Sequence, residues 1–166
     1  GGAGGVYSFW LASLGHTVHL VDIVPKHIAH AQRLASEPGT ARLASMLVGD
    51  ARDLDYASAS ADVIIMHGPL YHLPDRKDRL QALKEAKRIL RPGGVLLAFA
   101  ITRYAGAIFG LTRGYVFDAE YLAMTREEVA TGQRRRAPGW LNTFISGYFH
   151  HPDDLKHEIE ESGLIH

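Results

Sequence analysis

Short apolar runs of β-type sequence alternate with helical segments from Gly1 to about residue 101, and this alternation constrains the fold more than any other feature. Strand-like runs are expected at residues 17–21, 44–48, 63–66 and 95–100. Apolar residues at helical spacing lie between them. Alternating strands and helices are typical of an α/β protein with a parallel sheet. The sequence therefore predicts a Rossmann-like, doubly wound, mostly parallel sheet in one domain covering residues 1–166.

Two of the expected strands, residues 63–66 and 95–100, are continuous apolar runs without alternating polar positions. Such runs are typical of strands that are buried on both faces of a parallel sheet. We therefore expect helices to cover both sides of these two strands.

The chain opens on a glycine cluster, Gly1-Gly2-Ala3-Gly4-Gly5. Such a turn normally joins a strand to a helix and lets the backbone approach a ligand closely. Because no strand precedes it here, we expect a chain that lacks the first strand of the fold and, after His166, its last strands. The spacing lacks the third glycine of a dinucleotide fingerprint, and no Gly-Lys-Ser/Thr follows as in a phosphate-binding loop. A nicotinamide cofactor is therefore disfavoured.

Two aspartates end neighbouring strands of the expected sheet: Asp22 after the first run and Asp50 after the second. In open α/β sheets, ligands bind outside the carboxyl ends of the strands. Asp22 has the chemistry to hold a ribose diol, and Asp50 the chemistry to accept from an adenine amine, with the Ala51 N–H donating beside it. Each also has a plainer interpretation as a capping or turn aspartate.

The segment from His67 to His72 follows the next strand and contains a Gly68-Pro69 turn. It lies on the same expected edge of the sheet. His67 and His72 have the chemistry of bases, but we favour the interpretation that one packs against a ligand and the other holds the loop.

Charge and composition exclude several classes of protein. Lys and Arg together number 18, as do Asp and Glu, so no basic field indicates nucleic acid binding. The absence of cysteine excludes disulfides, thiolate metal sites and cysteine nucleophiles. No apolar run is long enough to span a bilayer, which would need about 20 residues. These features predict no metal site, no membrane association and a cytoplasmic location.

Residues 102–147 interrupt the strand–helix rhythm with many aromatic residues and a basic run, Arg134-Arg135-Arg136. Asp118–Ala130 is expected to be helical, ending at Gly132. A segment of this length is usually functional in a compact domain, so we expect a substrate lid. A structural excursion with its own small core, or a dimer contact, is the alternative. The basic run suits either an anionic substrate or a solvated surface.

The ordered motifs as a set resemble the class I S-adenosylmethionine-dependent methyltransferases, most closely the ubiquinone-biosynthesis-like branch that acts on small molecules. The segments that carry the resemblance are GGAGGVY, LVD, GDA, MHGPLYHL and RILRPGGVLLAF, with YFHHP near the end. One departure is Ala3, which stands where the family has a glycine.

The resemblance implies a set of residues for each part of the site. The glycine turn would face the methionine part of S-adenosylmethionine, Asp22 the ribose, and Asp50 with Ala51 the adenine. The cofactor-binding residues expected in this way are Gly1, Gly2, Ala3, Gly5, Tyr7, Asp22, Ile23, Asp50, Ala51, His67 and Tyr71. Weak candidates for a catalytic base are His67, Tyr71, His72, Tyr148 and His150.

The expected activity is in-line methyl transfer to a small-molecule acceptor, with the acceptor and the oligomeric state left open. A non-catalytic domain that binds S-adenosylmethionine, or an RNA or protein methyltransferase, is the alternative. Histidines 150 and 151, just before a helix that begins at Pro152, are expected at the surface more often than in a site.

Overall fold

The computed structural model describes residues 1–135, 138–140 and 146–165. Its regular elements are α1 (Val6–Ser13), β1 (His19–Asp22), α2 (Pro25–Ala35), β2 (Ser45–Val48), β3 (Ala61–His67), α3 (Pro69–His72), α4 (Arg76–Ile89), β4 (Leu90–Phe99), α5 (Ala105–Arg113), η1 (Tyr115–Phe117), α6 (Ala119–Thr131), β5 (Gln133–Arg134), η2 (Pro138–Trp140), β6 (Gly147–Tyr148) and α7 (Pro152–Glu161). The alternation of strand and helix predicted up to residue 101 is confirmed.

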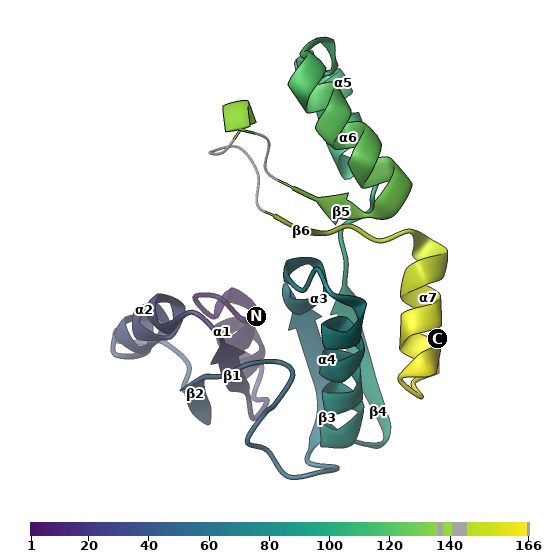
Figure 1. Ribbon diagram of the computed structural model, residues 1–166. Helices are drawn as coiled ribbons and strands as arrows, with labels where there is room; N and C mark the ends of the chain where they lie inside the picture. Colours follow the sequence, from purple (N-terminus) through teal and green to yellow (C-terminus); the bar gives the residue numbers. More distant parts are fainter. Residues whose placement is uncertain (136–137, 141–145, 166) are drawn as a thin grey trace.

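The four long strands form two parallel pairs, β1 with β2 and β3 with β4 (Figure 1). A third, short pair, β5 with β6, is antiparallel. Parallel pairing requires a crossover connection, which α2 and α4 supply. The Rossmann-like α/β fold class is confirmed, although within the described residues the pairs do not join into one continuous sheet.

Amphipathic helices cover one side of each pair. Ile28 and Ala31 of α2 pack with Leu20 of β1 in one small core. A larger core lies between β3 and α4, where Met66, Leu70, Ala82, Leu83 and Ala86 are buried. Pro25 starts α2 at a position where its missing N–H costs nothing.

The other face of the β3–β4 pair differs from the prediction. Val63 is 53% exposed, and Val95, Leu97 and Phe99 are also exposed on β4. The apolar run therefore does not indicate burial on both faces here, because α4 covers only one side of the pair within the described part of the chain (Figure 1).

Residues 102–135 fold into a helical unit beyond the ends of β3 and β4 (Figure 1). Tyr121 and Met124 of α6 are buried there against Tyr115, Val116 and Trp140. Asp118 caps α6 by accepting from the Tyr121 N–H at 2.8 Å, and Gly132 ends it in the left-handed region with a φ of 76°. The predicted helix is confirmed, and the segment does bury a small core of its own.

Backbone hydrogen bonds join the two ends of the segment that contains this helical unit. The Ile101 carbonyl accepts from the His150 N–H at 2.7 Å, and the Arg103 N–H donates to the His150 carbonyl at 3.0 Å. Thr102 and His150 form a parallel bridge. The helical unit therefore leaves the sheet and returns to it at one point.

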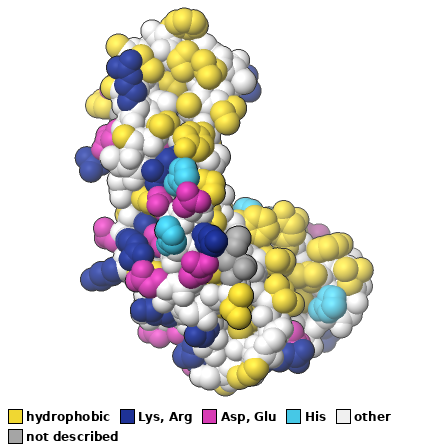
Figure 2. All heavy atoms as spheres, turned by 90° about the vertical axis from the view of Figure 1, so that its right-hand side faces the viewer, with side chains coloured by type: hydrophobic (Ala, Val, Ile, Leu, Met, Phe, Trp, Pro, Cys, Tyr) yellow, Lys and Arg dark blue, Asp and Glu magenta, His cyan; other side chains and the backbone are white. Residues whose placement is uncertain are grey.

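A buried ion pair joins α4 to α7. The Arg79 guanidinium donates to Glu158 through Nε and through Nη2, the latter at 2.7 Å, and both side chains are almost completely buried. The same guanidinium donates to the Leu73 and Pro74 carbonyls and stacks over the Tyr148 ring at 3.6 Å. Charged side chains gather over α4 and α7, whereas hydrophobic ones dominate the helical unit above them (Figure 2).

Arg79→Ala is expected to lower the free energy of unfolding by about 3–5 kcal/mol, because it leaves the Glu158 carboxylate buried without its main cation. Arg91→Ala is the control, because Arg91 pairs at 2.5 Å with Asp62 and both side chains are exposed. Its loss should cost at most about 1 kcal/mol. Denaturant unfolding of both variants measures the difference, and equal losses would contradict the assignment.

Candidate functional site

The glycine turn is anchored to the end of β1 by one carboxylate. Asp22, only 6% exposed, accepts from the Ala3 N–H through Oδ2 at 2.8 Å. The Gly2 N–H donates to the Val21 carbonyl at 3.0 Å, so the backbone of the turn lies along the strand end. The turn and the first predicted aspartate are therefore in direct contact.

The other oxygen of Asp22 holds the start of the next segment. Oδ1 accepts from the Val24 N–H at 2.9 Å and lies 3.0 Å from His27 Nδ1. Burial opposes ionisation, but the hydrogen bonds from Val24, Ala3 and His27 outweigh it and hold the pKa of Asp22 below its ordinary value. Asp22 is thus an ionised, oriented acceptor at the rim of the sheet.

The ends of β2 and β3 lie at the same rim. The Gly49 N–H donates to the Asp22 carbonyl at 3.1 Å, which brings β2 beside β1. A Cβ placed on Gly1 would lie only 2.8 Å from the His67 carbonyl oxygen at the end of β3. Only glycine allows this approach, so the turn touches the ends of two different strand pairs.

Asp50 is engaged within its own loop. Its carboxylate accepts from the Arg52 N–H at 2.9 Å and from the Arg52 guanidinium, with Nη2 at 2.6 Å. Hydrogen bonding to Arg52, more than burial, sets the pKa of Asp50, which is lowered. Arg52 also donates to Asp78 at 2.8 Å. Asp50 therefore forms a turn contact with Arg52, its backbone and Ala51 lie at the rim, and its contact with adenine stays a prediction.

Apolar and aromatic side chains flank Asp22 and His67. Ile23 is 60% exposed and Tyr7 is 55% exposed, so both present surface to a ligand. The His67 ring lies 4.8 Å from the Phe99 ring and 6.0 Å from the Tyr7 ring, measured between centroids. The Tyr71 hydroxyl lies 3.3 Å from His67 Nδ1, and burial raises the pKa of Tyr71.

The remaining candidates for a base lie elsewhere or are exposed. His150 is 2% exposed and its Nε2 lies 3.2 Å from Glu158 Oε2, so the expectation of a surface position was wrong for it. The reason is that β6 brings His150 against the α4–α7 ion pair.

The other candidates lie near it or at the surface. Tyr148 lies under the Arg79 guanidinium, and burial raises the pKa of Tyr148. His151 caps α7, accepting from the Asp153 N–H at 3.3 Å. His72 lies beside the Tyr71 ring with much of its surface exposed. The burial of the rest of the side chain lowers the pKa of His72.

The basic run 134–136 is not a free anion site in its described part. Arg134 is buried in an ion pair with Glu128, and Arg135 lies 3.5 Å from Glu127. Arg136 lies outside the described residues. Among those residues no cluster of histidine and carboxylate side chains is placed to hold a metal ion, and no described helix is long and apolar enough to cross a membrane.

Sequence reasoning missed His27, Arg52 and Phe99. His27 stands in the first turn of α2, close enough in sequence to reach the carboxylate that ends β1, and Arg52 follows Asp50 at Asx-turn spacing. The contacts of His27 and Arg52 could have been predicted from their spacing in the sequence. The contact of Phe99 with His67 depends on the register of β3 against β4.

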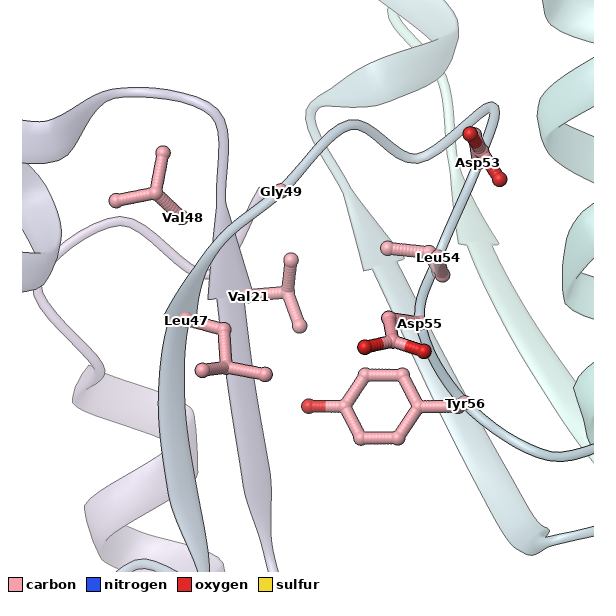
Figure 3. Close-up of a pocket in the computed structure, with 8 residues that line it drawn as sticks. All are labelled: Val21, Leu47, Val48, Gly49, Asp53, Leu54, Asp55 and Tyr56. Carbon is pink, nitrogen blue, oxygen red and sulfur yellow. The ribbon is translucent and has the colours of Figure 1, made fainter.

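A small hollow of about 120 Å³ lies beside the β1–β2 pair, between Val21, Leu47 and Leu54 (Figure 3). Ligand pockets are usually roughly 300–1,000 Å³. Asp22 and the glycine turn do not line it. We therefore take the rim above it, rather than this hollow, as the candidate site.

Comparison with known proteins identifies the family of this chain. A family model described as a methyltransferase domain matches residues 1–98, which include the glycine turn, both aspartates and His67. An S-adenosylmethionine-dependent methyltransferase from Methanosarcina mazei is similar over 98% of this chain and 76% of its own, with a TM-score of 0.76 and 26% identity.

Two further structures share the fold. A protein from Pyrococcus horikoshii OT3 is 27% identical, covering 69% of this chain and 51% of its own, with a TM-score of 0.57. A methyltransferase from Streptomyces caelestis covers 98% of this chain and 70% of its own, with a TM-score of 0.67 and 17% identity. The chain thus spans about half to three quarters of the length of these proteins.

The turn contains a strained residue that can be tested. Ala3 has a φ of 44°, in the left-handed region that costs a residue with a Cβ about 1–2 kcal/mol. Ala3→Gly is therefore expected to raise the free energy of unfolding by up to about 1 kcal/mol, after the entropy cost of glycine. Thermal or denaturant unfolding measures it.

Two controls bracket this result. Ala59 also has a positive φ, of 54°, and Ala59→Gly should stabilise by a similar amount. Ala29, exposed in α2, has helical geometry, and Ala29→Gly should destabilise by about 1 kcal/mol. If Ala3→Gly behaved like Ala29→Gly, the strain at the turn would be refuted.

Proposed function

The chain belongs to the methyltransferase-domain family, and from that premise we propose that it transfers a methyl group from S-adenosylmethionine to a small-molecule acceptor. The observation that carries the proposal is the Asp22 carboxylate, which joins the glycine turn to the rim where three strands end. The finer placement in the ubiquinone-biosynthesis-like branch, and a cytoplasmic location, are supported by the sequence motifs and the cysteine-free composition alone.

The residues at the rim fit the cofactor. Glycines at the turn leave room for a ligand against the backbone, and α1 begins directly behind them with its N-terminal N–H groups. Asp22 retains capacity to accept from a hydroxyl, because a carboxylate has about four lone-pair sites and three are used here. Exposed Ile23 offers an apolar surface for a flat ring, next to the loop that carries Asp50 and Ala51.

When bound, the cofactor supplies an electrophilic methyl group: the acceptor atom bonds to the methyl carbon, and the electrons of the carbon–sulfur bond return to sulfur. The protein then has to orient the acceptor, exclude water and accept a proton. Residues 102–147 are proposed as the lid over the acceptor, because α5 and α6 lie beyond the carboxyl ends of β3 and β4 (Figure 1) and both ends of the segment are fastened at His150.

We assign the proton-accepting role to Tyr71 with His67. A hydroxyl or amine acceptor can pass its proton to Tyr71 Oη while the Tyr71 proton moves to His67 Nδ1, 3.3 Å away, in the tautomer that carries its hydrogen on Nε2. Tyr71 keeps its own proton at neutral pH, since the ordinary pKa of tyrosine is about 10 and burial raises the pKa of Tyr71 further. Tyr148 and His150 are less suited, because both are committed to the network around Arg79 and Glu158.

Asp22→Ala is expected to weaken binding of S-adenosylhomocysteine to the full-length protein by more than tenfold, or about 1.4 kcal/mol, because it removes the acceptor for the ribose and the anchor of the glycine turn. Titration calorimetry measures the affinity. Asp62→Ala is the control, since Asp62 is exposed and pairs with Arg91 at 2.5 Å. Unchanged affinity in the Asp22 variant would remove this residue from the site.

Turnover separates an enzyme from a domain that only binds the cofactor. S-adenosylmethionine labelled on its methyl group is incubated with the full-length protein and, separately, with small molecules, RNA and protein. We expect label only in a small molecule. With that acceptor, Tyr71→Phe should lower kcat by about 10²- to 10⁴-fold. Because the variant keeps the ring that is expected to contact the cofactor, the affinity for S-adenosylhomocysteine should change little. Tyr148→Phe should leave kcat nearly unaltered, and the reverse pattern would exchange the two roles.

A further inference from the structure

A cavity of about 320 Å³ lies under α5, just past the end of β4. Its volume is at the lower end of the range of small-molecule sites, which is roughly 300–1,000 Å³. The residues that line it are Ile101, Ala105, Gly106, Phe109, Arg134 and Phe149. It is large enough for one or two aromatic rings and is formed within the segment proposed as the lid.

The described walls of this cavity carry no net charge. Among the described residues that line it, the one ionic side chain is that of Arg134, which is fully buried in an ion pair with the equally buried Glu128. The Gly106 N–H donates to Glu128 at 3.0 Å, and the Tyr121 hydroxyl donates to the Gly106 carbonyl at 2.7 Å. Since the carboxylate already balances the guanidinium, an anionic ligand would gain little here and would lose its hydration.

The rings of Phe109 and Phe149 and the aliphatic side chain of Ile101 form the apolar part of the lining. Apolar surface removed from water contributes about 25 cal/mol per Å². A neutral aromatic or alkyl group is therefore the ligand that these walls favour.

The cavity adjoins the rim where the methyl group would be presented. The Phe99 ring at the end of β4 lies 4.8 Å from the His67 ring. Ile101, which lines the cavity, follows two positions later, so the two Cα atoms are at most about 7 Å apart. The Ile101 carbonyl is fixed by the His150 N–H at 2.7 Å. A Cβ placed on Gly147 would overlap the Tyr71 carbonyl oxygen, so the segment that carries Phe149 also passes close to Tyr71. Ile101 and Phe149 therefore place one side of the lining near the Tyr71–His67 pair.

We propose that this cavity binds the apolar part of the methyl acceptor, and that the substrate class is an uncharged, largely aromatic or alkyl small molecule whose nucleophilic atom faces the rim. The inference rests on the proposed function. It assigns acceptor selection to residues of α5 and to Phe149, and not to the basic run that begins at Arg134.

The test uses 2-naphthol as a neutral probe and 2-naphthoate as its anionic counterpart, titrated into the full-length protein saturated with S-adenosylhomocysteine. We expect 2-naphthol to bind at least tenfold more tightly than 2-naphthoate. Ala105→Phe, which fills the cavity, should weaken 2-naphthol binding at least tenfold and leave the affinity for S-adenosylhomocysteine unchanged. Leu111→Phe is the matched control, since Leu111 is 68% exposed on the same helix.

A measurement on the unaltered protein removes any dependence on the folding of the variant. Nuclear Overhauser effects should connect the naphthol protons to the Ile101 methyl groups and not to those of Ile108, which is 58% exposed on α5. Tighter binding of naphthoate, or contacts to Ile108 alone, would overturn the proposal while the methyltransferase assignment stood. Failure of S-adenosylhomocysteine to bind would instead overturn the proposed function.

Discussion

The hydrogen bond between the Ala3 N–H and Asp22 Oδ2 connects the parts of this structure that matter for function. One oxygen of the carboxylate fixes the glycine turn, and the other fixes the start of the segment that leads into α2. The Asp22 carbonyl meanwhile accepts from Gly49 at the end of β2. One residue therefore sets the relative position of the turn and of two strand ends. Because its partners keep the carboxyl ionised in a site that is 6% exposed, the same group is ready to accept from a ligand hydroxyl without further rearrangement.

Sequence periodicity predicted the four long strands, the helices between them and the shared rim of Asp22, Asp50 and His67, because those features follow from local spacing and from the geometry of parallel sheets. It did not predict α5 or the short β5–β6 pair. Burial was less predictable. The run at 63–66 has the composition of a strand covered on both sides, yet Val63 is half exposed, since composition does not specify which faces receive a helix. The hydrogen-bonding partner of the Asp50 carboxylate was also not predicted. Its pairing with Arg52 is local, but whether a turn aspartate binds its neighbour or a ligand depends on the side-chain conformation of the neighbour.

Long-range contacts explain the other differences. His150 looks like a surface residue before a helix, but the antiparallel β5–β6 pair brings it, together with Tyr148, against Arg79 and Glu158, which are distant in sequence. Arg134 looks like part of a solvated basic run, but Glu128, six residues earlier in α6, neutralises it inside the helical unit. In both cases a buried charge is tolerated only because an opposite charge meets it. Sequence spacing alone does not reveal which cations are paired in this way.

The two halves of the site use different physical means. On the cofactor side, backbone N–H groups, glycines and carboxylates make directional contacts, which suit a ligand of fixed polar chemistry. On the acceptor side, apolar walls around a closed ion pair offer mainly area and shape. In-line methyl transfer requires little from the protein beyond alignment and the exclusion of water. Substitutions that change side-chain volume on the proposed acceptor side can therefore alter which ligand binds there without disturbing the cofactor side. The hydrogen bonds of His150 to Ile101 and Arg103 hold the described helical unit, residues 102–135, at the end of β4. The proposed acceptor side is thereby kept in position relative to the rim, as a reaction that depends on alignment requires.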